Sequence, residues 1–484
     1  MKADIMGGQN FPACLLAYCL GFSPFTQAFD GFCELPELVS GDAASVVYSD
    51  IIFDLFTDEV EARIFDVNSD GLDDIILLGF VNPDKEWDGE GREGRIYINE
   101  GENGFVRAAG DVPFTVTPRE NLYADFDSNG LIDFFIADHG WDASPFPGFS
   151  NTLMLQFETG WVNASSELPP DPEGFTHNAA IADVDNDGDV DIFVLNQGFK
   201  EVDNLKYWLI NDGAGNFSVN DSLMPDSLPL GGVADEFWRT WAAAAEDLDG
   251  DGFADLVIGG TTENGGASRI YWGGNRGFSD ASMTLLEFSD ATRSLESEET
   301  TVEVVTAKVL DVDGDGKLDL LLGGYNGWFE SRFTELWMNA GNRVFTEQSQ
   351  RRLGRLATSS KSRWPLDYRF FDFNDDGLTD IVPEYFLLRE EDVIAWLGDG
   401  SGFFVPLEPN GVEGSGDLDG AIGHYVTSSK GRYAVRFYEY DGELHSNSQY
   451  FEGSSSIKAF PCYLGNLPPL TPVQKVDLEE ALLR

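Results

Sequence analysis

Six nine-residue loops carry the side chains in this sequence with the clearest capacity for metal chemistry. Each follows the pattern D-x-[DN]-x-[DN]-G-x-x-D, with oxygen-bearing side chains at positions 1, 3, 5 and 9 and glycine at position 6. Calcium prefers such oxygen ligands and takes roughly six to eight of them in a flexible cage. The candidate ligands are therefore Asp66, Asn68, Asp70 and Asp74 (loop 1), Asp125, Asp127, Asn129 and Asp133 (loop 2), Asp183, Asp185, Asp187 and Asp191 (loop 3), Asp247, Asp249, Asp251 and Asp255 (loop 4), Asp311, Asp313, Asp315 and Asp319 (loop 5), and Asp372, Asn374, Asp376 and Asp380 (loop 6).

Three other interpretations of these loops are an EF-hand, a plain turn and a magnesium site. An EF-hand begins in the same way but needs Glu at position 12 and flanking helices, whereas position 12 here is Leu, Ile, Val or Pro in runs typical of strands. Asp and Gly also form plain turns, but six loops that all close with Asp favour metal binding, because unpaired carboxylates this close repel each other. Magnesium demands a stricter octahedral geometry. We therefore expect about six calcium ions, one for each loop.

The segments that must position the loops are typical of short strands. An apolar run such as IFVLNQG follows each loop at once and favours a buried strand. An aromatic strand, a glycine turn and Phe come next, as in Tyr207–Phe217 (YWLINDGAGNF), Arg269–Phe278 (RIYWGGNRGF) and Leu336–Phe345 (LWMNAGNRVF). The loops begin 59, 58, 64, 64 and 61 residues apart. A repeat of this length with two hairpins predicts a four-stranded blade.

The number of repeats predicts an all-β fold consisting of a single seven-bladed β-propeller over residues 44–460, with calcium-binding loops in six blades. The seventh unit is degenerate, because Gly416–Gly420 begins a loop that lacks the final acid, and residues 433–445 supply its strand pair. Residues 46–56 offer an extra strand, and a ring protects its edges best when one terminus completes the last blade. Six or eight blades remain as alternatives.

The loops and the Phe-Gly turns between them resemble the FG-GAP and VCBS repeats, over roughly residues 45–450. These repeats form the β-propeller heads of integrin α subunits and occur in many secreted bacterial proteins. The resemblance implies that the acidic side chains ligate calcium together with one backbone carbonyl from position 7. This sequence departs from the pattern at Asn68, Asn129 and Asn374, which are still oxygen donors. Integrin-like propellers meet other proteins, and bacterial relatives are often adhesins or carbohydrate-handling proteins.

The charge of the chain restricts its partners. The sequence holds 30 basic and 85 acidic residues, a formal net charge of −55. Nucleic acid and anionic membrane surfaces are therefore not expected as partners, because both need a basic face. The acidity fits a solvated surface as well as metal binding. Disorder is not expected, because hydrophobic residues make up 42% of the chain and recur in regular runs.

The two ends of the chain suggest export. Residues 1–28 are predicted to be a cleaved export signal, since the apolar stretch Phe11–Phe22 precedes a small-residue site at Thr26–Ala28. An N-terminal segment that stays in place is the alternative. Residues 29–43 are then a lead-in and residues 461–484 a C-terminal tail. Cys33 and Cys462 form a disulfide or are two unrelated thiols. We expect a secreted, periplasmic or cell-surface location, and no other apolar stretch is long enough to span a membrane.

Residues that point to catalysis are few. His139 and His177 could lie near one propeller face, although hydrogen-bonded histidines that stabilise turns are the favoured interpretation. The basic cluster of Arg351, Arg352, Arg355, Lys361 and Arg363 is expected to be a solvated loop, with an anion contact as the alternative. GxSxG, HExxH and CxxC motifs do not occur. Loop tryptophans that could stack on sugars or anchor a protein are Trp87, Trp141, Trp328 and Trp364.

These features favour a secreted or surface-exposed, calcium-stabilised binding module for a protein or polysaccharide partner, with a role in adhesion or recognition. A carbohydrate-active enzyme, such as a polysaccharide lyase or hydrolase with its site at the propeller mouth, is the alternative. A structural subunit of a surface assembly is a third hypothesis. An enzyme is the less favoured of these, and the ligand itself is not predicted.

Overall fold

The structure is a computed structural model, and it describes residues 60–71, 74–81, 88–100, 105–144, 146–171, 174–196, 206–220, 222–225, 228, 240–297, 300–327, 331–354, 357–358, 365–371, 376–385, 393, 395–407, 425–427, 433–440, 443–452 and 456–463. The predicted export signal, the lead-in and the extra strand at 46–56 lie outside these residues. Cys33 does as well, so the proposed bond to Cys462 stays a prediction.

Six antiparallel four-stranded sheets follow one another along the chain, and the strands of each pair in the order of the sequence. We number them blades 1 to 6 after the acidic loop that each contains. Their strands are β1 (Val60–Phe65), β2 (Asp74–Gly79), β4 (Arg95–Asn99) and β5 (Phe105–Arg107); β7 (Pro118–Ala124), β8 (Asp133–Asp138), β9 (Thr152–Phe157) and β10 (Gly160–Asn163); β11 (Thr176–Ala182), β12 (Asp191–Asn196), β13 (Lys206–Asn211) and β14 (Phe217–Asn220); β15 (Ala243–Glu246), β16 (Asp255–Ile258), β17 (Ala267–Tyr271) and β18 (Met283–Glu287); β19 (Val302–Leu310), β20 (Asp319–Asn326), β21 (Arg332–Asn339) and β22 (Phe345–Glu347); and β24 (Pro365–Phe371), β25 (Asp380–Tyr385), β26 (Ala395–Gly398) and β27 (Phe404–Leu407).

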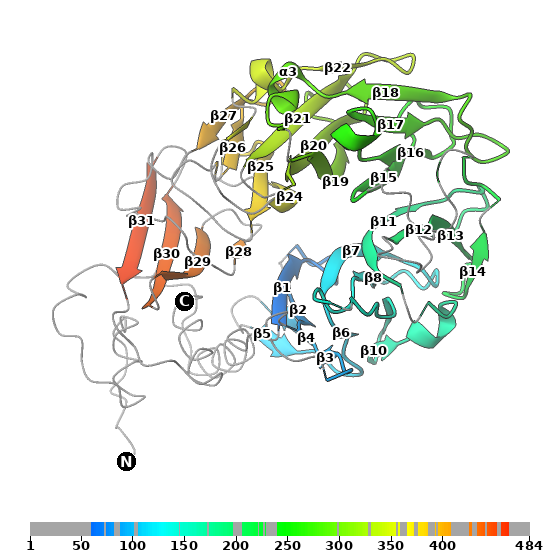
Figure 1. Ribbon diagram of the computed structural model, residues 1–484. Helices are drawn as coiled ribbons and strands as arrows, with labels where there is room; N and C mark the ends of the chain where they lie inside the picture. The colour runs from blue at the N-terminus through cyan, green and yellow to red at the C-terminus, as the bar shows by residue number, and fades with distance from the viewer. Residues whose placement is uncertain are drawn as a thin grey trace.

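Smaller elements join the blades. The strands β3 (Arg92–Glu93) and β6 (Phe114–Thr115) pair with each other between blades 1 and 2, and β23 (Ala357–Thr358) pairs with β21. The short helices are η2 (Ser165–Glu167), η3 (Thr262–Asn264), α3 (Asp290–Arg293) and α4 (Ser349–Arg352). Figure 1 shows the blades arranged around a ring, which is the arrangement of a β-propeller.

The prediction of seven blades is wrong, because the structure has six. A further sheet of β28 (Tyr425–Thr427), β29 (Tyr433–Tyr440), β30 (Glu443–Glu452) and β31 (Ser456–Tyr463) follows blade 6, and β28 lies against β1. This sheet differs from blades 1 to 6 in having no acidic loop between its first two strands, since residues 428–432 between β28 and β29 contain no acid. The truncated loop at Gly416–Gly420 precedes β28 instead and lies outside the described residues.

The hydrophobic core lies between neighbouring blades. In β12, Ile192 and Val194 pack in the cluster shared with blade 2, whereas Phe193 and Leu195 pack in the cluster shared with blade 4. Successive side chains of a strand point to opposite faces. A blade with a neighbour on each side therefore needs apolar residues on both faces, which explains why the runs after the acidic loops are apolar without alternation.

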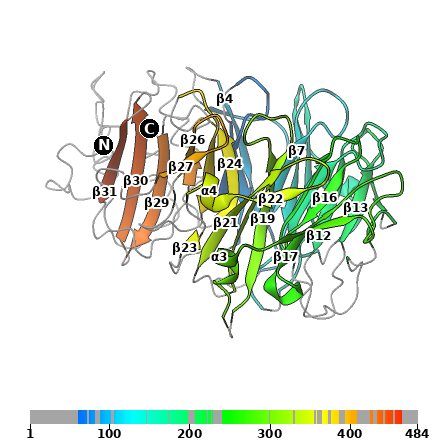
Figure 2. The same cartoon turned by 90° about the horizontal axis from the view of Figure 1, so that it is seen from above.

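The acidic loops and the hairpin turns between third and fourth strands share one end of the blades. Each loop joins the first strand of a blade to the second, as loop 3 joins β11 to β12. In an antiparallel meander the connections leave the sheet at alternating ends, so the third-to-fourth turn lies at the same end as the loop. The second-to-third connections and the links between blades leave at the opposite end. Figure 2 shows the blades side by side from above.

Candidate metal sites

The carboxylate at position 1 holds each acidic loop in shape. In loop 3, Asp183 Oδ1 accepts a hydrogen bond from Asp187 N and its Oδ2 accepts one from Gly188 N, both at 3.0 Å. The equivalent bonds occur in loops 1, 2, 4 and 5 at 2.7–3.2 Å. These bonds wrap the backbone of the loop around its first side chain, which brings the side chains of later positions toward it.

Backbone conformation explains the glycine at position 6. Its φ angle lies between 83° and 101° in all six loops, at Gly71, Gly130, Gly188, Gly252, Gly316 and Gly377. This left-handed region is costly for residues with a Cβ atom. Position 4 is also left-handed in loops 1 to 5, where it is Ser69, Ser128, Asn186, Gly250 or Gly314. The glycine at position 6 therefore permits the sharp turn of each loop.

Asp at position 9 is buried and ties three elements together. In blade 3, Asp191 Oδ2 accepts from Val184 N at 2.9 Å and its Oδ1 accepts from Asn211 N, at the end of β13, at 2.8 Å. Loops 2, 4 and 5 repeat both bonds at 2.7–3.1 Å. The closing Asp therefore joins the loop to the second and third strands, a structural role that adds to its expected role as a ligand.

Burial also changes the acidity of these closing carboxyls. Desolvation, reinforced by the negative charges of the loop, raises the pKa of Asp133, Asp191 and Asp255 to about 7 and that of Asp319 to about 6, although backbone N–H groups oppose the shift. A negative charge that is disfavoured by burial and by like charges is stabilised by a nearby cation. The electrostatics of the loops therefore suit a positive charge.

Four loops bring three carboxylates together. Oxygens within 4.8 Å of one another come from positions 1, 3 and 9 in loops 2 and 3, and from positions 1, 3 and 5 in loops 4 and 5. In loop 1, Asn68 Nδ2 donates to Asp70 Oδ2 at 3.2 Å. In loop 6 only Asp376 and Asp380 are described, whereas Asp372 and Asn374 lie outside the described residues. The donors are all oxygens, which fits a hard cation such as calcium.

Amides that the sequence analysis missed connect the loops of neighbouring blades. Asn211 Nδ2 donates to Val190 O in its own loop at 3.1 Å and to Phe126 O in loop 2 at 2.8 Å. Asn339 makes the same pair of bonds, to Leu318 O in loop 5 and Leu248 O in loop 4. The only sequence signal is Asn as the last residue of a third strand, just before the glycine turn.

The basic cluster is not simply a solvated loop. Arg352 is 11% exposed, donates to Asp313 Oδ2 in loop 5 at 3.1 Å and to Gly402 O at 3.0 Å, and lies over the Phe403 ring. The interpretation as a solvated loop is therefore wrong for Arg352, because loop 5 supplies a carboxylate partner. Arg351 is exposed, and Arg355, Lys361 and Arg363 lie outside the described residues.

The two histidines singled out by the sequence meet in the interior. Their Nε2 atoms are 3.0 Å apart, so one ring donates a hydrogen bond to the other, and Phe175 and Trp241 pack against them. Burial lowers the pKa of both His139 and His177 well below the usual value for histidine, and the positive charge of Arg119 lowers it further. Two neutral, enclosed imidazoles fit a structural role, which was the favoured interpretation.

The comparisons with known proteins agree with this architecture. The fold is an all-β propeller with a repeated acidic loop. Residues 183–258, which include loops 3 and 4, and residues 311–382, which include loops 5 and 6, match the model of the FG-GAP-like repeat. These two stretches are therefore FG-GAP-like repeats within a β-propeller, which confirms the predicted resemblance over those residues. No curated protein sequence matches the chain.

Three solved structures align with the chain at low sequence identity and low TM-score. A mutant of the lectin of Aleuria aurantia is 10% identical with a TM-score of 0.34, over 86% of this chain and 99% of the lectin. The Nup133 β-propeller domain of Vanderwaltozyma polyspora is 10% identical with a TM-score of 0.30, over 83% and 89%. The sialidase of Trypanosoma rangeli is 11% identical with a TM-score of 0.29, over 87% and 56%. Within the described residues, no helix is long and apolar enough to cross a membrane.

Proposed function

We propose that this chain is a calcium-stabilised binding module, secreted, periplasmic or on the cell surface, whose propeller recognises a protein or polysaccharide partner. The observation that carries the proposal is the repeated acidic loop, which has the same backbone bonds in five blades and converging carboxylates in four. FG-GAP-like repeats in a propeller support a binding or recognition role. The calcium would be held by positions 1, 3, 5 and 9 and by the carbonyl of position 7.

Calcium in these loops would act on the seams between blades. Each loop begins where the first strand ends, and in blades 2 to 6 its closing Asp accepts a hydrogen bond from the third strand or the residues just after it. Asn211 also bonds the carbonyl of loop 2, so a change in one loop reaches the next blade. Clustered carboxylates oppose this packing unless a positive charge offsets their repulsion. A bound cation would therefore stiffen the ring.

The partner would bind at the end of the propeller opposite to the acidic loops. The second-to-third connections and the links between blades leave the sheets at that end. Trp141, which is partly exposed, lies in such a connection between β8 and β9. Trp87, Trp328 and Trp364, the other loop tryptophans singled out in the sequence, lie outside the described residues. Exposed aromatic side chains stack on sugar rings or anchor protein partners.

The test combines stability with binding. The mature protein is unfolded by heat in excess chelator and again after calcium is restored, and both forms are screened against glycans and surface proteins. We expect a substantially lower melting temperature in chelator, recovery with calcium, and calcium-dependent capture of one partner class. An unchanged transition in chelator would refute the stabilising role of calcium. Hydrolysis or cleavage of a captured polysaccharide would instead support the alternative of a carbohydrate-active enzyme.

A further inference from the structure

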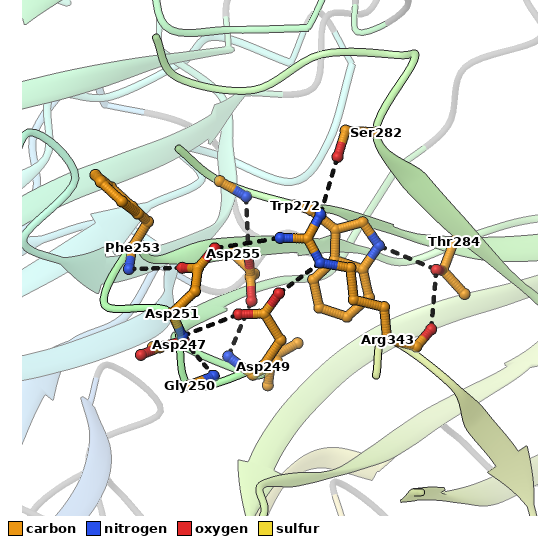
Figure 3. A network of polar contacts seen from close by, with 12 residues as sticks. Asp247, Asp249, Gly250, Asp251, Phe253, Asp255, Trp272, Ser282, Thr284 and Arg343 are labelled. Atoms are coloured by element: carbon orange, nitrogen blue, oxygen red, sulfur yellow. Dashed lines mark hydrogen bonds and ion pairs between the residues drawn. The ribbon is translucent and has the colours of Figure 1, made fainter. Parts of the chain in front are cut away.

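Loop 4 already has a cation among its carboxylates, and that cation comes from the neighbouring blade. Arg343 lies in the turn between β21 and β22 of blade 5. Its Nε donates to Asp249 Oδ2 at 2.5 Å, and a second guanidinium nitrogen donates to Asp251 Oδ2 at 3.2 Å. Figure 3 shows the guanidinium facing both of these side chains, which occupy positions 3 and 5 of loop 4.

Blade 4 holds this guanidinium from several sides. Arg343 Nη1 donates to Ser282 Oγ at 3.2 Å, and its central carbon lies 4.9 Å from the centre of the Trp272 ring. Thr284 Oγ1 accepts from Trp272 Nε1 at 3.0 Å and donates to Arg343 O at 3.3 Å. The Asp249 side chain is only 9% exposed. A planar guanidinium that is stacked and bonded in this way is pre-organised rather than loosely placed.

We propose that Arg343 is the resident counter-cation of loop 4. It latches blade 5 onto blade 4, and a divalent cation enters loop 4 only by displacing it. The displacement of Arg343 by a divalent cation rests on the proposed binding of calcium by these loops, whereas the latch between blades 4 and 5 does not.

The competition follows from the atoms involved. Asp247, Asp249 and Asp251 place oxygens within 4.8 Å of one another, and a cation in loop 4 would use these three carboxylates. Arg343 already bonds two of the three carboxylates. A calcium ion and a guanidinium that share the same oxygens repel each other. Loops 2 and 3 differ, since no ion pair reaches their position 1, 3 or 5 carboxylates within the part of the chain that the structure describes.

The chain contains a matched control for this arginine. Arg276 occupies the same place in the motif G-N-R-x-F of blade 4 that Arg343 occupies in blade 5. It is exposed, and among the described residues it forms no ion pair. The turns differ, because Asn342 and Arg343 both have positive φ, at 55° and 63°, whereas in blade 4 Gly277 is the left-handed residue, at 75°. The conformation of the turn therefore directs Arg343, and not Arg276, into a loop.

The experiment measures calcium binding and stability of the wild type, R343Q and R276Q. Calcium binding is followed by calorimetry on chelator-treated, desalted protein. We expect R343Q to bind one calcium ion about tenfold more tightly than the wild type, which corresponds to about 1.4 kcal/mol, since the ion pair no longer has to be broken. R276Q should match the wild type, and D249N in the R343Q background should abolish the gain. Identical isotherms for R343Q and R276Q overturn the competition.

Thermal unfolding in excess chelator tests the latch separately. R343Q should melt below R276Q without calcium, and the difference should shrink at saturating calcium, because the ion replaces the lost charge. Equal melting temperatures in chelator overturn the latch. If no protein binds calcium, the proposed calcium function and the competition both fail, while the chelator data still decide on the latch. If R343Q does not fold, R343K replaces it. It should differ from the wild type and from R276Q in the direction expected for R343Q in both measurements, since lysine cannot bond both carboxylates as a fork.

Discussion

Loops 3 and 4 are built from nearly the same pattern, DVDNDGDVD and DLDGDGFAD, and the structure gives them the same backbone bonds. They differ in how their negative charge is balanced. In loop 3 the carboxylates of positions 1, 3 and 9 converge, whereas in loop 4 Arg343 bonds positions 3 and 5. The difference teaches that the same loop scaffold can receive an arginine from the neighbouring blade, as in loop 4, or form no such ion pair among the described residues, as in loop 3.

The largest expected effect comes from the closing Asp at position 9, which loops 3 and 4 share. D191A and D255A should each lower the free energy of unfolding by about 3 kcal/mol in chelator, because each leaves two buried or partly buried N–H groups without an acceptor. Urea unfolding of both variants measures this. A loss below about 1 kcal/mol in chelator, with a large loss only in calcium, would show that the closing Asp acts mainly as a ligand.

A buried lysine provides a second contrast between blades 3 and 4. Lys206 of β13 is buried, whereas the equivalent register position of β17 is Ser268, whose Oγ accepts from Gly260 N. Burial lowers the pKa of Lys206 to about 8. The pKa of Lys206 is lower in the folded protein than in the unfolded chain, so folding releases a proton between about pH 8 and 10.5. The folded state is therefore most stable above about pH 10.5 and loses this stability as the pH falls through about 8.

K206M should therefore stabilise the protein at pH 7, by about 2 kcal/mol as an order of magnitude. The wild type should gain stability between pH 8 and 10.5 relative to K206M, whose curve lacks this rise. Chemical unfolding across this range, with S268A as a control in blade 4, checks the prediction. Parallel pH profiles for wild type and K206M would contradict it.

The smallest expected effect is the loss of stability when the position 6 glycine is replaced, and it should be equal in loops 3 and 4. G188A and G252A place a Cβ at φ angles of 101° and 90°, where no neighbouring atom lies within 4 Å. The cost is therefore backbone strain alone, about 1–2 kcal/mol. Melting temperatures of the two variants should fall by similar amounts. A fall confined to G188A would mean that Arg343 holds loop 4 in shape without help from the glycine.

Much of the fold could be predicted from the sequence, because the regular features are local. The acidic loops mark the turn between first and second strands, and the apolar runs after them are buried on both faces as expected. The seventh blade was predicted from a truncated loop and a strand pair. The strand pair exists as β29 and β30, but the chain places no acidic loop between β28 and β29.

The charge balance of the loops could not be predicted, because it depends on contacts between blades. Arg276 and Arg343 have the same local motif, and only the backbone of the second turn places its arginine against a loop. Asn211 likewise bonds a carbonyl 85 residues away in sequence. Such partners are brought together by the ring, and a repeat pattern alone does not specify which blade supplies them.

The most direct test of the account is the number of calcium ions bound tightly by D185N and D249N, the position 3 variants of loops 3 and 4. Each is compared with the wild type by equilibrium dialysis at a calcium concentration that just saturates the tightest sites. We predict that D185N loses one ion, because loop 3 depends on an external cation, and that D249N loses none, because Arg343 already balances loop 4. Equal losses in the two variants, or no loss in D185N, would contradict the account.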